Sequence, residues 1–376
     1  MRESAESRRR RITTLIQQHG DIRISDLAGL FHVSAMTIRR DVEMLVEEGA
    51  VQRRHGRVQS PQSTATSWTD RLQCVPILVP AHHPYLQTVA EGARDRLESQ
   101  GYRAPIRIAP DTPQGLRNMV EKLQQDLRMD GLIVAPRWNT EAQEAEDREQ
   151  LARLPCPAVL LERPPGDSPE LAAIDSAATD HRFGVRLAVE DLVRHGHRRI
   201  LLATRLDSPT ARSISTAFAA IAQEHPLVEH WDRVLSAPEA LPRELRTTDV
   251  GESTTGEAAH PVRYPDFGDA HWLVTILRRE EFSAVLIHSD VNALVLVQQL
   301  VTYGVDIPGD CAVIAYDDVV ASHGLVPLTA VAPPKIEVGQ AAAGLMSSRL
   351  QATSAGQSWT PQRIQLLPSL RVRSSS

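Results

Sequence analysis

From residue 75 onward, short apolar runs alternate with longer amphipathic segments, and this alternation restricts the possible folds more than any other feature of the chain. The apolar runs occupy residues 75–80, 104–109, 130–136 and 157–163, with amphipathic segments at 86–102 and 115–129. Strands that alternate with helices form parallel sheets with helices on both faces. The sequence therefore predicts a doubly wound α/β fold.

The second half of the chain repeats this pattern. Helical periodicity is found at residues 181–197, 210–225 and 290–304, and strand-like runs at 198–204, 282–289 and 311–318. Two doubly wound units of about 130 residues each predict two lobes with a cleft between them. Residues 237–269 lack apolar periodicity, so we expect a partly mobile surface insertion there.

The N-terminal segment "VSAMTIRRDVEMLVEEG" predicts a capped helix with one buried face. Ser34 is a good N-cap, and Gly49 suits the left-handed residue that ends a helix. Ile38, Val42 and Leu45 follow at spacings of four and three, so they share a face. We expect this face to be buried in the core of the N-terminal domain.

The opposite face of this helix carries Thr37, Arg40 and Met44, with Arg39 on its flank. Residues 8–31 upstream predict two more short helices, the second capped by Ser25. Downstream, "AVQRRHGRVQS" predicts a basic hairpin, or wing. Three small helices and a wing make a helix-turn-helix unit.

The charge distribution supports binding to a polyanion at this end. Residues 1–60 have a net charge of +3 and the remaining chain −9, within a total of −6. A basic head on an acidic body favours local attraction to nucleic acid. The alternative is that the arginines at 8–11 form only a solvated helix start.

"VSAMTIRRDVEMLVEEGAVQRRHG" resembles the signature of the DeoR-family winged helix-turn-helix. The resemblance implies that Ser34, Thr37, Arg39 and Arg40 belong to a DNA-reading helix, with Thr37 and both arginines in the major groove. The wing arginines Arg53, Arg54 and Arg57 would contact phosphates. Arg57 and Val58 stand where the family usually has glycine and a small residue, so a stiffer, more basic wing is expected.

The whole chain of 376 residues predicts domains at 1–59 and 74–376, joined by a linker at 60–73 that is rich in Ser, Thr and Gln. Cys74, Cys156 and Cys311 occur singly, which indicates buried small side chains rather than disulfides. We find no apolar run long enough to cross a membrane and expect a cytoplasmic, nucleoid-associated protein.

Four motifs in order, "RHGHRRILLAT", "GVDIPGDCAVIAYDD", "VPLTAVAPP" and "LLPSLRVRSSS", are similar to the effector domain of LacI/GalR repressors, which shares its fold with periplasmic sugar-binding proteins. The chain thus resembles a DeoR-type reader fused to a LacI-type sensor. The hinge helix of LacI-type proteins has no counterpart in residues 58–73. The mechanism by which that family couples its sensor to its DNA-binding domain is therefore not expected to apply unchanged to this chain.

Ligands of open parallel sheets bind beyond the carboxyl ends of the strands. The candidate ligand-binding residues are His83, Tyr85, Arg137, Glu162, Arg163, Asp290 and Asp317. The resemblance implies that Asp290 holds effector hydroxyls and that Tyr85 lines the mouth of the site. Alternatively, Asp290 caps the following helix, and Asp317 with Asp318 orients a loop.

The arginine that the family places four residues before an aromatic is absent, because Ile214 precedes Phe218 at that spacing. Arg212 is a possible substitute. This weakens the expectation of an ordinary sugar as effector.

Motifs of hydrolases, phosphate loops and dinucleotide-binding folds are missing, so we expect no enzyme activity and no cofactor. The pairs His82 with His83 and His195 with His197 lack further ligands at suitable spacing, so no metal site is predicted.

The sequence therefore predicts a homodimeric repressor that binds an operator in double-stranded DNA and responds to a small, sugar-like metabolite. One alternative is a body that has lost its ligand and serves only for dimerisation. The other is an enzyme of sugar or nucleoside metabolism with an attached DNA-binding domain.

Overall fold

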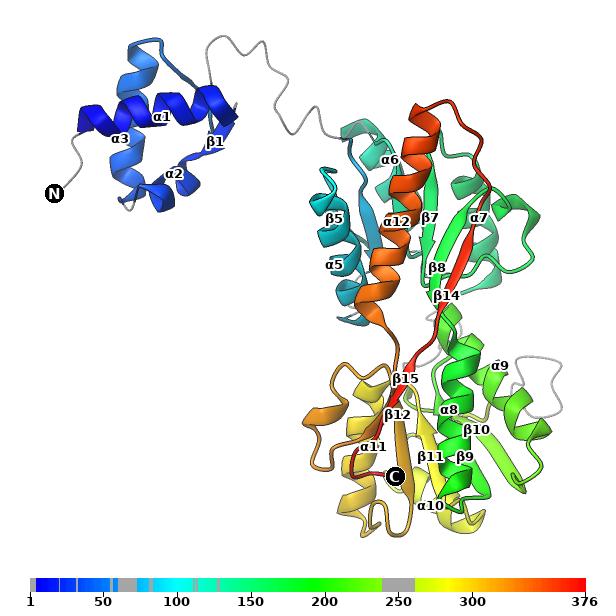
Figure 1. Ribbon diagram of the computed structural model, residues 1–376. Coiled ribbons are helices and arrows are strands. Elements are labelled where there is room, and N and C mark those ends of the chain that lie inside the picture. The colour runs from blue at the N-terminus through cyan, green and yellow to red at the C-terminus, as the bar shows by residue number, and fades with distance from the viewer. Residues whose placement is uncertain are drawn as a thin grey trace. The chain divides into compact units, whose positions relative to one another are not determined.

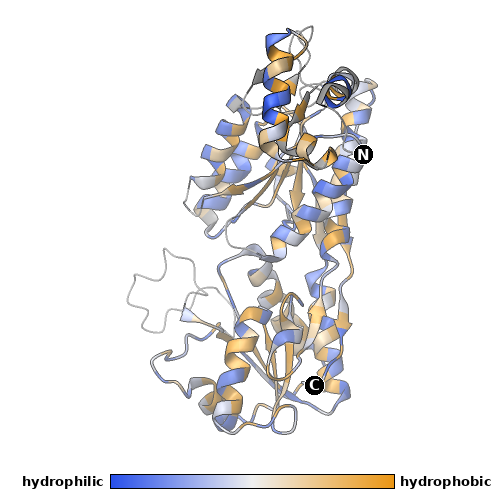
Figure 2. Cartoon of the chain, turned by 90° about the vertical axis from the view of Figure 1, so that its left-hand side faces the viewer, coloured by the Kyte–Doolittle hydropathy of each residue, from blue (hydrophilic) through white to orange (hydrophobic). Residues whose placement is uncertain are grey.

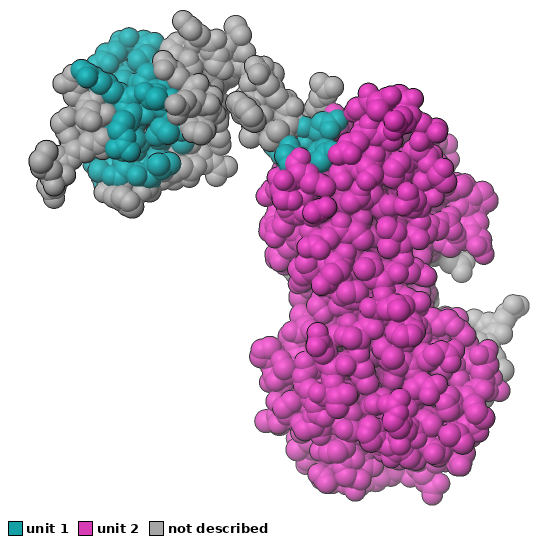
Figure 3. Space-filling view, viewed as in Figure 1, with its two compact units in different colours: residues 1–73, 101–103 teal, residues 74–100, 104–376 magenta. Residues whose placement is uncertain are grey.

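The computed structural model describes residues 5–19, 21–31, 33–54, 57–59, 73–80, 84–110, 112, 114–126, 129–238 and 261–376. Two compact units make up the chain (Figure 3). Unit 1 comprises residues 1–73 with 101–103, and unit 2 comprises residues 74–100 with 104–376. The expected linker lies outside the described residues, apart from Gln73.

Unit 1 is a winged helix-turn-helix (Figure 1). Its described elements are α1 (Ala5–His19), β1 (Asp21–Arg23), α2 (Ile24–Leu30), α3 (Ala35–Glu47), β2 (Gln52–Arg54) and β3 (Arg57–Gln59). The strands form an antiparallel sheet in the order β1-β3-β2. The predicted hairpin is present as β2 and β3, whereas β1, which pairs Ile22 with Val58, was not predicted.

The pairing of β1 also changes the start of the second helix. Because β1 runs to Arg23, α2 begins directly at Ile24, and Ser25 lies in its first turn rather than at the predicted N-cap position. The core of unit 1 is apolar: Ile12, Leu27 and Ile38 are all fully buried.

Unit 2 contains two lobes, each built on a mainly parallel sheet. The described first lobe consists of β4 (Ile77–Pro80), α5 (Pro84–Ser99), β5 (Ile106–Ala109), α6 (Gly115–Asp126), β6 (Leu132–Val134), α7 (Glu141–Ala152), β7 (Ala158–Leu161), η1 (Pro169–Leu171), β8 (Asp175–Thr179), α12 (Lys335–Ser354) and β14 (Arg363–Leu366). Its strand order is β14-β8-β7-β6-β4-β5, and all neighbours are parallel.

The second lobe is built in the same way. Its described elements are α8 (His181–Arg194), β9 (Arg199–Thr204), α9 (Pro209–Glu224), β10 (His230–Leu235), α10 (Trp272–Arg279), β11 (Ala284–Ile287), α11 (Asp290–Thr302), β12 (Ala312–Tyr316), η4 (Ala321–His323), β13 (Thr329–Ala332) and β15 (Ser369–Arg371). The strand order is β10-β9-β11-β12-β13-β15, and only β15 is antiparallel to its neighbour. The predicted doubly wound α/β class is confirmed.

The lobes do not follow one another along the chain, as two sequential units would. The chain passes from the first lobe to the second after β8, returns after β13 to form α12 and β14, and crosses again into β15. The C-terminal segment therefore completes both lobes.

The strands of unit 2 are largely hydrophobic (Figure 2), as expected for sheets that are covered on both faces. Alternate residues of β9 enter opposite layers of the second lobe: Leu201 packs in one apolar cluster, and Ile200 and Leu202 pack in the other. Among the described residues, no helix combines the length and hydropathy needed to cross a membrane.

Helices α5 and α12 pack side by side in the first lobe, and glycine allows their backbones to approach closely. A Cβ atom at Gly92 would collide with the carbonyl oxygen of Ile336, and one at Gly339 with the carbonyl oxygen of Val89. Because the obstructing atoms are backbone, a larger residue would force the helices apart.

The expected surface insertion at residues 237–269 is partly corrected by the structure. Residues 239–260 lie outside the described part. Arg263, however, adds to the edge of β10: its N–H donates to the carbonyl of Arg233 (2.8 Å), and its carbonyl accepts from Leu235 (2.9 Å). Phe267 packs edge-on against Trp272, with centroids 5.5 Å apart. Pairing with β10 therefore orders this end of the segment, although its sequence has no apolar periodicity.

Candidate functional site

The first candidate site is the exposed face of α3. Ser34 adopts an extended conformation, and its hydroxyl accepts a hydrogen bond from the backbone N–H of Thr37 (3.2 Å). Gly49 closes the helix with a φ of +69°. Both terminal predictions are therefore confirmed.

The two faces of α3 differ as predicted. Ile38 and Val42 are fully buried, and Leu45 is nearly so. Arg39 and Arg40 are exposed, whereas Thr37 is half-buried. Met36 and Met44 on the outer face are 63% and 44% exposed, which leaves apolar surface beside the two arginines.

The arginines of α1 form part of the fold of unit 1. Arg8 is only 9% exposed, and its Nε lies 2.6 Å from Oδ2 of Asp41, a buried residue of α3. The Nη1 of Arg9 lies 3.7 Å from Oε1 of Glu48, and the Arg11 guanidinium lies 4.9 Å from the Phe31 ring centroid. A merely solvated helix start is therefore wrong for Arg8, whose ion pair joins α1 to α3.

The proposed wing arginines lie in the hairpin. Arg53 and Arg54 belong to β2 and Arg57 to β3, with Arg54 paired to Arg57. Their side chains lie outside the described part of the structure.

The second candidate site lies between the lobes of unit 2. We call it the interlobe polar cluster, and it comprises Tyr85, Glu162, Thr179, His181, Arg205, His288, Asp290, Asn292, Tyr316, Asp317 and Lys335. Most of these residues stand at carboxyl ends of strands, as expected for an open parallel sheet.

Glu162 is the centre of the first-lobe part of the cluster. It accepts hydrogen bonds from the hydroxyls of Tyr85 (2.5 Å) and Thr179 (2.7 Å) and from the backbone N–H of Thr179 (3.1 Å). Burial opposes ionisation, but His181, Tyr85 and the Thr179 backbone outweigh it and lower the pKa of Glu162 to about 2. The carboxylate is therefore charged.

His181 connects this centre to the second lobe. Its Nε2 lies 3.6 Å from Glu162 Oε2, and its Nδ1 lies 3.1 Å from the hydroxyl of Tyr316. Burial raises the pKa values of the Tyr85 and Tyr316 hydroxyls well above their usual value, so both remain donors. A buried polar chain thus runs from α5 to β12.

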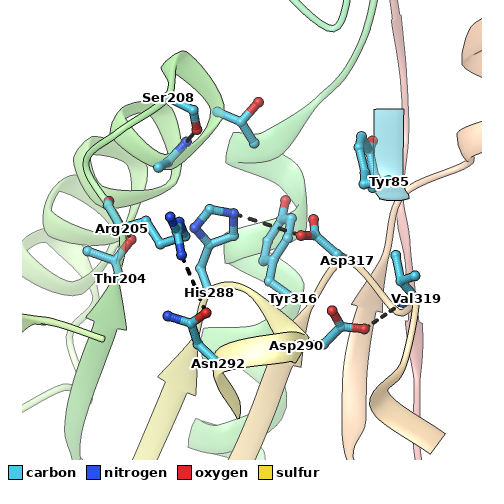
Figure 4. A network of polar contacts seen from close by, with 12 residues as sticks. Tyr85, Thr204, Arg205, Ser208, His288, Asp290, Asn292, Tyr316, Asp317 and Val319 are labelled. Atoms are coloured by element: carbon cyan, nitrogen blue, oxygen red, sulfur yellow. Dashed lines mark hydrogen bonds and ion pairs between the residues drawn. The ribbon is translucent and has the colours of Figure 1, made fainter. Parts of the chain in front are cut away.

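The second-lobe part of the cluster gathers around Asp317 (Figure 4). The carboxylate of Asp317 faces His288, whose Nε2 lies 4.0 Å away. Burial, and then the charge of Asp290, raise the pKa of Asp317 to about 7. Arg205 pairs with Asp207 through two hydrogen bonds (3.0 and 2.5 Å) and reaches the side-chain oxygen of Asn292 at 3.5 Å.

Asp290 does not act as the helix cap that was one of its two expected roles. Ser289 occupies the N-cap position of α11, so Asp290 is not the cap. Its Oδ2 instead accepts hydrogen bonds from the backbone N–H groups of residues 319, 320 and 321, at 2.5, 2.6 and 3.1 Å. Burial raises the pKa of this carboxyl group. Asp290 thus orients the loop that follows β12.

Three cations link the lobes. Arg163 donates to the carbonyl of Pro136 (2.8 Å) in its own lobe and to the Thr210 hydroxyl (3.2 Å) in the other. Arg212 donates from the second lobe to the carbonyl of Trp138 (2.8 Å). The Nζ of Lys335, at the start of α12, donates to the carbonyl of Asp317 (2.5 Å). Hydrogen bonds between residues of the same chain therefore connect the two lobes.

The candidate residues occupy conformations that are unusual for side-chain-bearing residues. Trp138, Glu162, Asp317 and Asp318 have φ values of 48°, 54°, 96° and 49°. All four follow a strand directly or closely. Left-handed backbone of this kind is costly and often occurs at functional sites.

The structure brings together Tyr85, Glu162, Asp290 and Asp317 among the residues proposed from the sequence. Arg163 and Arg212 lie in cross-lobe contacts, Arg137 is half-buried after β6, and His83 lies outside the described residues. Sequence reasoning missed Arg205 and His288, although both follow strands and obey the rule that found the others. It also missed His181 and Lys335, which begin helices α8 and α12 shortly after strands β8 and β13.

Metal ligation finds no support in the part of the chain that the structure describes, where no group of three or more His, Cys, Asp or Glu side chains is arranged to hold an ion. His82 and His83 lie outside that part. Cys74 and Cys311 are buried, Cys156 is half-buried, and no disulfide joins any two of them.

Family models match parts of both units. The family model of the DeoR-like helix-turn-helix domain matches residues 8–64, and that of the periplasmic binding protein-like domain matches residues 189–376, half of the chain. The chain is 25% identical over 305 residues to the HTH-type transcriptional repressor PurR of Haemophilus influenzae (strain PittEE), covering 80% of each chain. It is 26% identical over 303 residues to the ribose operon repressor of Escherichia coli (strain K12), covering 80% of this chain and 81% of the relative.

A solved structure with the same fold is the lac repressor dimer bound to operator and the anti-inducer ONPF. The TM-score is 0.60 and the sequence identity 20%, with 81% of this chain and 94% of the other covered.

Proposed function

This chain belongs to the family of periplasmic binding protein-like domains, and from that premise we propose that it is a DNA-binding transcriptional repressor controlled by a small polar metabolite. The observation that carries the proposal is the pairing of a capped, basic α3 in a DeoR-like unit with a two-lobed body. The relatives that match about four fifths of this chain, PurR and the ribose operon repressor, are transcriptional repressors. The chain is thus a DeoR-type reader joined to a LacI/GalR-type sensor.

In this proposal, α3 enters the major groove. Arg39 and Arg40 donate hydrogen bonds to guanine edges, Thr37 contacts a phosphate or a thymine methyl, and Ser34 fixes the N-terminus of the helix. The exposure of both arginines supports these roles. Arg53, Arg54 and Arg57 of the wing contact phosphates.

The metabolite binds at the interlobe polar cluster and the arginines beside it. The residues proposed from the sequence are Tyr85, Glu162, Asp290 and Asp317 of the cluster, and Arg137, Arg163 and Arg212 next to it. The convergence of Glu162, Asp290 and Asp317 from both lobes supports this site. A ligand that contacts both lobes favours one arrangement of them and thereby changes the affinity of the reader for DNA. We divide the chain into a reader at 1–59, a linker at 60–73 and a sensor at 74–376.

The protein acts as a homodimer in the cytoplasm, associated with the nucleoid, and each subunit reads one half of the operator. The lac repressor, whose fold unit 2 shares, was solved as a dimer on its operator. A cofactor and an enzymatic activity are not part of the proposal.

The contacts that Arg163, Arg212 and Lys335 make across the lobes favour one alternative: a body that needs no ligand and serves only for dimerisation.

Two measurements separate these functions. DNA fragments of the source genome that the purified protein retains should share one operator sequence; retention without any common sequence would contradict the proposal. Thermal shift against D-ribose, other sugars, polyols and nucleosides should reveal a stabilising ligand. A protein that selects an operator but is stabilised by no compound would support the ligand-free alternative, and product formation would reveal an enzyme.

A further inference from the structure

The carboxylate of Asp317 differs from the other acids of the interlobe polar cluster because no described residue donates a hydrogen bond to it. Its side chain is only 9% exposed, and the Nε2 atom of His288 lies 4.0 Å from its Oδ2, beyond hydrogen-bonding distance. Glu162 accepts three hydrogen bonds and Asp290 also accepts three. Of the three acids Glu162, Asp290 and Asp317, only Asp317 has a carboxylate that accepts no hydrogen bond from a described residue.

The neighbouring cations do not fill this capacity. The ammonium of Lys335 donates to the backbone carbonyls of Asp317 and Asp318, not to the Asp317 carboxylate. Arg205 is paired with Asp207. The carboxylate of Asp318 has its own partner, Arg373, at 2.8 Å.

The charged and titratable groups that face Asp317 come from several elements, and they include two carboxylates, Glu162 and Asp290, alongside the cations Arg205 and Lys335. They are Tyr85, Glu162, Arg205, His288, Asp290, Tyr316 and Lys335. A buried carboxylate without donors is unfavourable, and adjacent negative charges make it more so. A ligand cation would offset both effects, whereas a neutral hydroxyl would offset only the missing hydrogen bond.

We propose that the effector carries a protonated nitrogen that binds the Asp317 carboxylate between the lobes. This inference rests on the proposed function, because it assumes that the interlobe polar cluster is the effector site. It specifies the ligand class as a small polar cation, such as an amino sugar or an iminosugar, and makes Asp317 the residue that distinguishes it from a neutral analogue. Figure 4 shows Asp317 placed among His288, Tyr316 and Tyr85.

The test uses the full-length protein at pH 7, where the Asp317 carboxylate and the amine of an amino sugar are both substantially charged, and compares matched ligands by calorimetry and thermal shift. The pairs are D-glucosamine with N-acetyl-D-glucosamine, and D-ribose, D-glucose and D-galactose each with the iminosugar in which NH replaces the ring oxygen. We expect at least one charged member to bind roughly tenfold or more tightly than its neutral partner. Equal or tighter binding of the neutral members, or no binding of any charged member, overturns the proposal.

Two variants assign the preference to Asp317. Asp317→Asn keeps the shape, and asparagine tolerates the left-handed backbone at this position. It should abolish the preference for the charged ligand and raise the melting temperature of the ligand-free protein at pH 8, because an uncompensated buried charge is removed. The matched control, Asp318→Asn, breaks the ion pair with Arg373 and should lower the melting temperature while leaving the preference intact.

A preference for the charged ligand that survives in Asp317→Asn, or a fall in melting temperature like that of the control, overturns the assignment. Retention of genomic DNA by the same preparations is measured in parallel. If operator selection persists without the charged preference, only the ligand class is wrong; if operator selection is absent, the proposed function itself fails.

Discussion

Replacing Asp290 with alanine should destabilise the second lobe more than an ordinary loop substitution. The change removes the oxygen that accepts the backbone N–H groups of residues 319, 320 and 321. Ala321 is 1% exposed, so its N–H cannot regain a bond to water, whereas residues 319 and 320 are half-buried and can in part. Each buried donor left without an acceptor costs about 1–3 kcal/mol.

The carboxylate is itself unfavourable to bury, which reduces the net loss. Burial raises the pKa of Asp290, so part of the gain from the three bonds is already offset in the native protein. We therefore expect Asp290→Ala to lower the free energy of unfolding by about 2–4 kcal/mol, and Asp290→Asn, which keeps one acceptor oxygen, by about 1 kcal/mol.

Urea unfolding followed by circular dichroism measures these differences. The matched control is Asp310→Ala, which removes a single hydrogen bond that the exposed backbone N–H of Asp306 donates to the carboxylate (2.9 Å), and should cost less than about 1 kcal/mol. If Asp290→Ala cost no more than this control, the carboxylate would not be holding the loop after β12. An effector response that was lost without any loss of stability would instead make Asp290 a group that contacts ligand.

Four further outcomes are expected. Arg40→Ala should weaken specific DNA binding by roughly 1–3 kcal/mol without changing dimerisation, and unchanged footprints would remove Arg40 from the interface. Arg53→Ala should weaken binding to all sequences alike and reduce the salt slope by about one, whereas a loss at one base position would mean that the wing reads sequence. Arg8→Met should lower the free energy of unfolding of unit 1 by about 3 kcal/mol because it leaves Asp41 buried without its ion-pair partner; a change below about 1 kcal/mol in urea unfolding would contradict this. The pKa of Asp317 in the folded protein is about 7, above its ordinary value of 3.8, so the stability that its protonated form contributes is present below about pH 4 and is lost as pH rises to 7. The melting temperature of Asp317→Asn should not fall over this pH range for that reason. A pH profile identical to that of the unchanged protein would count against the assignment.

Local patterns were sufficient to predict α3 and most of the strands. Ser34, Ile38 and Val42 take the positions that capping and periodicity require, because those effects act within a few residues. The strand β1 could not be predicted in this way. Its three residues have a single apolar side chain, Ile22, and they become a strand only by pairing with β3, more than thirty positions away.

The candidate site was predicted less completely for a similar reason. Ligands of parallel sheets bind beyond the carboxyl ends of the strands, and this rule placed Tyr85, Glu162 and Asp317 in one region because it depends on topology alone. It gave no indication that Arg163 and Arg212 would bind a hydroxyl and backbone carbonyls of the opposite lobe. Such partners are defined only by the folded structure.

The three crossings between the lobes determine when each lobe can be completed during synthesis. Strand β14 and helix α12 belong to the first lobe, yet they are translated after almost all of the second. While the ribosome is making residues 181–332, the nascent first lobe lacks the helix that covers α5 and the strand that pairs with β8. Its apolar surface and its sheet edge stay open during that interval, which makes this intermediate a natural substrate for chaperones.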